Sequence, residues 1–440
     1  MPSANDTYAL LKTDKIKKLF STLYGKDKNS IELNIKRFEK VVNHFLNKFG
    51  DGDIQLFSTP GRTEIGGNHT DHNHGRVLAA SVDLDSIAAA IKTDENNIIV
   101  YSDAYEKPFV IDLAELNPKQ EEEGTTSSLI RGIAARFKEM TFQIGGFNAY
   151  ISSNVMVGSG LSSSASIEVL IGTILNSFYN EGKISEESIA IIGQFAENVY
   201  FNKPCGLMDQ MTCAVGGIVT IDFQEPKNPI VKKVKFHFYE QNFSLIVVDT
   251  GGNHADLTND YASIPREMKA VAAELGGKVG RDISMEKLLT ELKSLRSKVG
   301  DRAILRIYHF ITDNQRVTEQ VSALESDDFD KFLQLVNDSG NSSNKWLQNC
   351  YTIKNPTEQG VNLALAVTEN YLRKIAKGAC RVHGGGFAGT IQVFLPNEFT
   401  KKYVKIIQKI FGENAVLILN IRPLGTIHIN TKIYNERVGE

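Results

Sequence analysis

The stretch of this sequence best suited to hold a phosphate group is a run of small and hydroxylated residues. Residues 141–150 before it alternate in part, as in a half-buried strand, and the apolar residues 167–175 after it predict a helix. A helix N-terminus offers unpaired N–H groups and a positive dipole end, and glycines let a phosphate approach the backbone. The candidate residues are Gly158, Ser159, Gly160, Leu161, Ser162, Ser163, Ser164 and Ala165.

This run is not a P-loop, because no Gly-Lys-Ser or Gly-Lys-Thr closes it. A flexible linker is the alternative, although a linker between a strand and a buried helix would be unusual. Serine hydroxyls donate to phosphate oxygens and also ligate Mg²⁺. The sequence therefore favours a nucleotide phosphate as the ligand.

The segment Thr59–Gly75 is the most polar candidate, and its four glycines predict a loop. Its histidines and carboxylate suggest a transition metal, but they lack helical spacing and a nearby cysteine, so this signal is weak. Donors and acceptors at this density also suit a polyhydroxylated ligand, because each sugar hydroxyl both donates and accepts. The chemically capable residues of this segment are Arg62, Asn68, His69, Asp71, His72 and His74.

Two carboxylates further along could take part in the same chemistry. Asp209 follows Pro204–Gly206 among leucine and methionine residues, so it needs a partner or a function, although it could simply cap a helix. Glu197 ends an apolar helix and could reach a metal–phosphate complex, but a glutamate there is most often solvated. The loop Gly384–Gly389 could close over phosphates or serve only tight packing.

The elements that must position these residues form an α+β mixture without a repeat period. Proline and basic residues between 225 and 240 indicate a change of domain, so we expect domains at 1–230 and 231–440. Strands are predicted at 54–57, 86–91, 98–101, 217–222, 243–248, 390–395, 415–419 and 426–429. Helices are predicted within 8–49 and at 127–137, 185–200, 264–275, 285–295, 303–323, 328–339, 360–377 and 401–411.

Composition narrows the class of protein. A net charge of -3 gives no electrostatic reason to expect nucleic acid or an anionic membrane as a partner. No run reaches the roughly 18 apolar residues of a membrane helix, and the first residues lack a secretory signal. Four cysteines without zinc spacing fit a reducing cytoplasm. We expect a cytoplasmic protein that is a monomer or a weak homo-oligomer and acts on small molecules.

Taken together, these segments resemble the GHMP kinases, and within them the galactokinases. Residues 61–72 are similar to the galactokinase signature GRVNLIGEHTDY, and residues 160–166 to the family's ATP-binding motif. Residues 204–210 are similar to PCGIMDQ, and residues 381–389 to the third, glycine-rich motif. The four motifs occur in the family's order and span most of the chain, which makes the resemblance specific.

The resemblance implies transfer of the γ-phosphoryl group of ATP to the anomeric hydroxyl of a sugar, in the cleft of a GHMP-kinase-like two-domain α+β fold. The residue sets that it implies are Asp209 and Arg62 as catalytic; Asn68, His69, Asp71, Gly206 and Tyr261 as sugar-binding; and Ser163 and Glu197 as Mg²⁺-binding. Phosphoryl transfer needs in-line positioning and neutralisation of charge, which such residues supply.

Asn68 departs from the signature, which has glutamate at a position that contacts the sugar near O6. His72, His383 and Ala388 also depart from the family motifs. An amide at position 68 would tolerate a carboxylate at C6, so galacturonate or another galactose derivative is an alternative to galactose. A non-catalytic sugar and ATP sensor is a further alternative, since the family contains such regulators, but the second motif is intact here. The third alternative is a metal-dependent hydrolase whose metal is bound by the histidines of the segment Thr59–Gly75.

Overall fold

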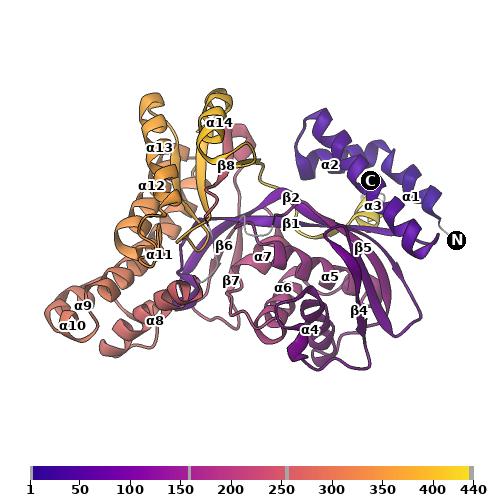
Figure 1. Cartoon of the computed structure of the whole chain (residues 1–440), viewed down its shortest axis with the longest axis horizontal. Helices are drawn as coiled ribbons and strands as arrows, with labels where there is room; N and C mark the ends of the chain where they lie inside the picture. Colours follow the sequence, from indigo (N-terminus) through magenta and orange to yellow (C-terminus); the bar gives the residue numbers. More distant parts are fainter. Residues whose placement is uncertain (1–2, 157–159, 253–256, 436–440) are drawn as a thin grey trace.

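The computed structural model describes residues 3–156, 160–252 and 257–435, which build two β-sheets with helices packed on them (Figure 1). The strands of the larger sheet are β1 (Gln55–Gly66), β2 (Arg76–Lys92), β3 (Asn97–Ser102), β4 (Tyr105–Asp112), β5 (Phe147–Ser153), β6 (Ile218–Asp222), β7 (Ile230–Val234) and β12 (Ile427–His428). They lie in the order β12-β1-β2-β5-β3-β4, and β6 joins β7 to β2. All neighbours are antiparallel except β3 and β5.

Both faces of the larger sheet are covered, which explains why its central strand β2 contains the apolar runs 77–80 and 87–91. Ala88 and Ala90 of β2 face one hydrophobic cluster, while Ile87 and Ala89 face another, because successive side chains of a strand point to opposite faces. One face carries α1 (Ala4–Leu11), α2 (Asp14–Tyr24) and α3 (Lys28–Phe49). The other carries α4 (Thr126–Glu139), α5 (Ser163–Tyr179), α6 (Glu186–Phe195) and α7 (Met208–Val215).

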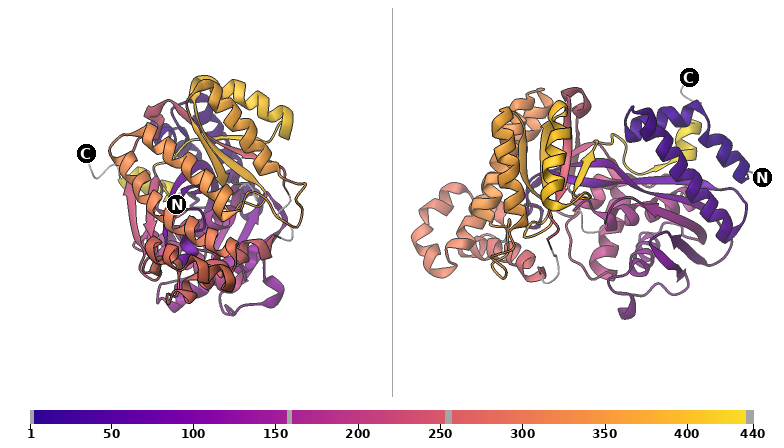
Figure 2. Two further views of the ribbon diagram at one scale, coloured as in Figure 1. Left: turned by 90° about the vertical axis from the view of Figure 1, so that its left-hand side faces the viewer. Right: turned by 45° about the horizontal axis from the view of Figure 1, so that its top comes forward.

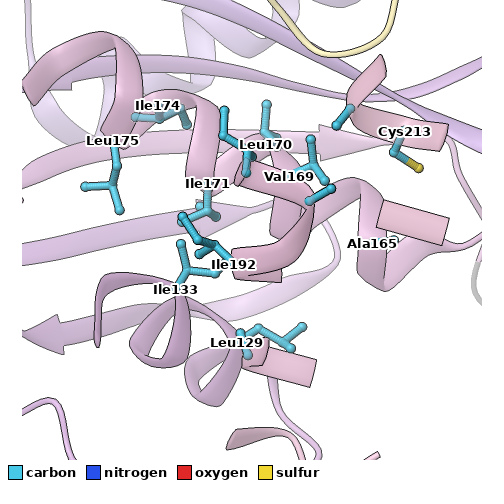
Figure 3. Packing of buried hydrophobic residues seen from close by; sticks show 14 of the residues in the cluster. Leu129, Ile133, Ala165, Val169, Leu170, Ile171, Ile174, Leu175, Ile192 and Cys213 are labelled. Atoms are coloured by element: carbon cyan, nitrogen blue, oxygen red, sulfur yellow. The ribbon is translucent and has the colours of Figure 1, made fainter. Parts of the chain in front are cut away.

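The helix α5 is the centre of the hydrophobic cluster that contains Ala88 and Ala90. Figure 3 shows its side chains Val169, Leu170 and Ile171 packed near Ile133 of α4 and Ile192 of α6, all of them almost inaccessible to solvent. Burying each such side chain contributes about 1.5–3 kcal/mol. The N-terminus of α5 is therefore fixed in place by apolar packing that begins within its first turn.

The smaller sheet has the order β11-β8-β10-β9. Its strands are β8 (Phe243–Asp249), β9 (Ala379–His383), β10 (Thr390–Pro396) and β11 (Val416–Leu419). The helices of this half are α8 (Thr258–Glu274), α9 (Met285–Thr290), α10 (Leu292–Lys298), α11 (Asp301–Glu325), α12 (Phe329–Ser342), α13 (Gly360–Ile375) and α14 (Asn397–Phe411). No helix in the described part of the chain is long and apolar enough to cross a membrane.

The end of the chain returns to the first sheet. Strand β12 pairs with β1, and Ile429 and Ile433 of α15 (Ile429–Asn435) belong to the hydrophobic cluster of α1–α3. Figure 2 shows the yellow end of the chain beside the indigo N-terminal helices. Strand β7 also belongs to the first sheet although it starts at the predicted boundary near residue 230. The α+β fold class is confirmed, while the boundary between 1–230 and 231–440 stays a prediction.

Most predicted elements are present, but the prediction of a loop for the polar segment Thr59–Gly75 was wrong in its first half. We expected a loop over 59–75, whereas β1 continues to Gly66 through irregular pairing near Pro60 and again near Ile65. Every residue of β1 after Gln55 is buried, so the strand has no apolar alternation to reveal it. Strand β5 begins at Phe147, later than expected, and β4, β7 and β9 have no predicted counterpart.

A buried ion cluster ties the N-terminal helices and the chain end to the sheet. Asp85 is fully buried and accepts hydrogen bonds from Tyr24 at 2.6 Å, Ser58 at 2.5 Å, Arg37 at 2.9 Å and Arg422 at 3.1 Å. Burial opposes ionisation of the Asp85 carboxyl, but the two arginines hold its pKa below the ordinary value. The charge of Asp85 therefore contributes to stability.

We predict that Asp85→Asn lowers the free energy of unfolding by about 3–5 kcal/mol near neutral pH, because it leaves buried arginines without a counter-charge. The folded-state pKa is depressed, so this contribution is present above about pH 4 and is lost as the pH falls through the folded pKa. Urea unfolding of both proteins between about pH 7 and pH 3 should show the difference narrowing at the acid end. The exposed pair of Asp14 with Lys17 supplies the control, and Asp14→Asn should change little.

Candidate active site

An ion pair between β1 and α7 forms the centre of the site. Arg62 Nε and Nη2 both lie 2.7 Å from Asp209 Oδ1, and Arg62 Nη1 donates to the carbonyl of Gly160. Ser162, the N-cap of α5, donates its hydroxyl to the other oxygen of Asp209. Gly61 permits this arrangement, because a Cβ there would lie 2.8 Å from the carbonyl oxygen of Leu161. The Asp209 side chain keeps 30% of its surface exposed, so it is accessible to a ligand.

The N-terminus of α5 lies directly beside this pair. The helix begins at Ser163 after Ser162, which has a left-handed backbone with φ of 62°. Leu161 and Ala165 are fully buried, so only their backbone groups can serve a ligand. The first N–H groups of α5 have no acceptor within the helix and suit an anion. Gly158 and Ser159 lie outside the described residues.

Glu197 lies in a π-helical turn, Ala196–Tyr200, that continues α6. Such turns insert a residue and re-aim side chains, and they are frequent at functional sites. Glu197 is 2% exposed and accepts from Ser164 Oγ at 3.0 Å and Lys203 Nζ at 2.8 Å. Ser163 was the predicted partner for a metal, but the hydroxyl that meets Glu197 belongs to Ser164. Successive side chains of a helix are rotated by about 100°, so the two serines point in different directions.

The predicted sugar-binding residues come from three separate segments. Gly206 packs so closely on Asp71 that a Cβ there would lie 2.0 Å from Asp71 Oδ2. Since Gly206 shortly precedes α7, this contact brings the polar loop to the segment that carries Asp209. His69 Nε2 lies 2.8 Å from the carbonyl of Gly385, and Tyr261 donates its hydroxyl to the carbonyl oxygen of residue 386 at 3.1 Å.

Burial lowers the pKa of His69 to about 4, so its ring is neutral near neutral pH. Because a carbonyl only accepts, Nε2 carries the proton and Nδ1 is left as an acceptor. Among the described residues no three His, Cys, Asp or Glu side chains converge as a metal site. The ring centroids of His69 and His72 lie 6.4 Å apart.

Comparison with known proteins decides the family. The galactokinase galactose-binding signature matches residues 43–92, and the GHMP kinases N terminal domain matches residues 128–217. A galactokinase of Mannheimia succiniciproducens is 30% identical over 82% of this chain and 91% of its own length. A galactokinase of Glaesserella parasuis is 30% identical over 87% of this chain and 93% of its own length. The chain belongs to the galactokinase family.

Solved structures show the same fold as this galactokinase-family chain. The Lactococcus lactis galactokinase complexed with galactose superposes with a TM-score of 0.74 at 22% identity, covering 88% of this chain and 98% of that one. The Methanococcus jannaschii mevalonate kinase superposes with a TM-score of 0.60 at 19% identity, covering 84% of this chain and 99% of that one. The predicted GHMP-kinase fold is therefore confirmed.

The side chain of Asn68 is engaged by protein groups, whereas the galactokinase signature implies contact with a sugar at this position. Its side chain is fully buried, and Nδ2 donates to Glu64 at 2.9 Å and to the carbonyl of Gly384 at 2.8 Å. Its Oδ1 accepts from Asn349 at 2.7 Å and from Ser343 at 3.3 Å. All four hydrogen-bonding positions of the amide are thus used within the protein, and none is left for O6 of a sugar.

Two residues of the site were missed by the sequence analysis. Glu168 lies in the apolar run 167–175, and Gln210 follows Asp209 in the segment 204–210 that is similar to PCGIMDQ. Both are fully buried, and Gln210 Nε2 donates to Glu168 Oε2 at 2.9 Å. Burial, and then the charge of Glu197, raises the pKa of Glu168 well above its ordinary value. An acidic residue inside an apolar helix was the signal available.

We predict that Asn68→Glu lowers the free energy of unfolding by at least about 2 kcal/mol, because it removes two donors and places a second carboxylate beside Glu64. Activity toward all sugars should fall to the same extent, without a selective loss for a sugar that carries a carboxylate at C6. Urea unfolding and kcat/KM on two sugars measure this. Glu64→Gln in the same chain should recover part of the lost stability. Undiminished stability of Asn68→Glu would mean that residue 68 is accessible after all.

Proposed function

We propose that this chain is an ATP-dependent galactokinase, which transfers the γ-phosphoryl group of ATP to the anomeric hydroxyl of galactose. The observation that carries the proposal is the Arg62–Asp209 pair held against the N-terminus of α5. Membership of the galactokinase family and the matched galactose-binding signature support the choice of sugar. No transmembrane helix is found in the described residues, and the reaction needs none.

In the proposed reaction each residue of the site has a separate task. In the reaction the anomeric oxygen forms a bond to the γ-phosphorus while the bond to the β-phosphate oxygen breaks and ADP leaves. Asp209 is the acceptor that orients the anomeric hydroxyl and takes up its proton, and Arg62 neutralises charge beside it. The N–H groups at the start of α5 meet the phosphate oxygens. His69 and Asp71 contact sugar hydroxyls.

The residues present also fit Mg²⁺. Ser164 Oγ and Glu197 Oε1 are hard oxygen donors 3.0 Å apart, beside the helix N-terminus proposed to bind phosphate. Sites of this kind hold Mg²⁺ with one or two carboxylates together with substrate phosphates, so a larger cluster is not needed. Lys203 is 60% exposed and can move aside from Glu197. Bound there, Mg²⁺ would neutralise charge on the phosphates.

The burial of Asn68 supports galactose over galacturonate, the alternative substrate. That alternative depended on an amide facing C6, whereas Asn68 is buried with all its hydrogen bonds made within the protein. The sensor alternative has no supporting observation, because Ser162, Arg62 and Asp209 form an intact cluster in which the Asp209 side chain is accessible.

A panel of acceptors tests the proposed reaction. With ATP and Mg²⁺, we expect phosphorylation of galactose at C1, with kcat/KM higher than for galacturonate, galactosamine, glucose or mevalonate. ADP release measures the rate, and ³¹P NMR of the product identifies the position. Preference for galacturonate, or nucleotide binding without transfer to any acceptor, would contradict the proposal.

Asp209→Asn should lower kcat by at least about 100-fold, the scale of a positioned acid–base group, and leave ATP binding intact. The change keeps the volume of the side chain and one acceptor for Arg62. Turnover and calorimetric ATP binding measure the two effects. The control is Asp301→Asn, which weakens the exposed two-bond pair of Asp301 with Arg296 between α10 and α11. Near-parental turnover in a folded Asp209→Asn protein would rule out the catalytic assignment.

A further inference from the structure

We propose that Glu168 is a positioning residue of this site, which sets the orientation of Glu197 through the side-chain amide of Gln210. The inference rests on the proposed function only where it treats Glu197 as the residue that would hold Mg²⁺. The arrangement itself is a property of three side chains from three different elements.

The amide of Gln210 bridges the two carboxylates. Its Nε2 donates to Glu168 Oε2 at 2.9 Å and to Glu197 Oε2 at 2.8 Å. An amide nitrogen has two hydrogens, so both are used in this bridge. Oxygen Oε2 of Glu197 is thereby fixed on the buried side, and Oε1 is turned toward Ser164 and Lys203. The bridge sets the orientation of the Glu197 carboxylate toward the proposed phosphate site.

The three side chains are held by rigid parts of the fold. Glu168 belongs to the second turn of α5, Gln210 to the first turn of α7, and Glu197 to the π-helical turn. Gly193 of α6 makes room for the bridge, because a Cβ there would lie 3.2 Å from Glu168 Cβ and 3.3 Å from Gln210 Cγ. Apolar residues of the main cluster surround the group, so it cannot easily rearrange.

Packing alone does not account for a carboxyl at position 168. Glu168 Oε1 and Gln210 Oε1 are both buried, and neither has a hydrogen-bond partner among the described residues. Buried polar atoms without hydrogen-bond partners lower the stability of the fold, and an apolar side chain of similar volume would avoid that loss. Residues retained at such a cost occur where the arrangement serves a site. Gln210 also directly follows Asp209, so the bridge restrains the turn that carries both.

Two substitutions separate positioning from packing. Glu168→Leu removes both acceptors and should raise the Mg²⁺ concentration that gives half-maximal turnover by about 5- to 10-fold, the scale of one lost hydrogen bond. Glu168→Gln keeps an acceptor for Gln210 and should stay within about 2-fold of the parent. Glu197→Gln provides the comparison for direct loss of the proposed ligand, since a neutral amide is a poorer partner for a hard cation.

Two further readouts do not need turnover. Calorimetric binding of Mg²⁺ with a non-hydrolysable ATP analogue should weaken in Glu168→Leu by the same factor. In a crystal structure of Glu168→Leu without ligand, the Glu197 carboxylate should leave its position against Gln210 and Ser164. Thr173→Val is the matched control, because it removes a buried hydroxyl from the same helix, bonded to Thr426 at 2.7 Å. It should alter stability without altering Mg²⁺ dependence.

An unchanged Mg²⁺ dependence and an unmoved Glu197 in Glu168→Leu would overturn the inference and leave Glu168 as a packing residue. Failure of the proposed function is distinct, because it would show in the parent protein as absence of phosphoryl transfer. In that case the position of Glu197 in the crystal structure of Glu168→Leu still decides the positioning role.

Discussion

The pairing of Arg62 with Asp209 is the constraint on which the arrangement of the site depends. One partner lies on an interior strand and the other on the first turn of a helix, and the arginine also holds the carbonyl of Gly160. Removing a guanidinium from water is costly unless its counter-charge and acceptors are in place. Strand β1, helix α7 and the segment before α5 must therefore meet at one point. The apolar cluster around α5 and α7 provides the packing that holds them there.

A second polar network joins the signature strand to the glycine-rich loop. Arg381 is fully buried and donates to Glu64 at 2.8 Å and to the carbonyl of Ile65 at 2.6 Å. The loop that follows presents its carbonyls to Asn68 and His69. A Cβ at residue 386 would lie 2.1 Å from the carbonyl oxygen of Asn349, so glycine is needed there for close packing. Of the two interpretations of this loop, tight packing is the one that the contacts support.

The sequence predicted the features that depend on local pattern. The start of α5 at its serine run, the N-terminal helices and the ordered motifs follow from periodicity, capping and spacing. It could not predict features that depend on three-dimensional burial. Strand β1 has no alternation because both its faces are covered, and Ser163 and Ser164 differ only in the direction that the helix gives them. Glu168 in a core helix was missed by the sequence analysis, because its partner Gln210 comes from a distant part of the sequence.

Asn68 shows why a departure from a motif has to be interpreted together with its neighbours in space. The signature has asparagine at the position of Glu64 and glutamate at the position of Asn68, so this chain carries the same two side-chain types in exchanged places. They are joined by a hydrogen bond of 2.9 Å, and the carboxylate that remains is paired with Arg381. The exchange therefore conserves the charge of the pair within a buried network. Taken alone, the asparagine implied a change of substrate at C6. Taken with Glu64, it implies a rearranged support beneath the loop that carries His69 and Asp71.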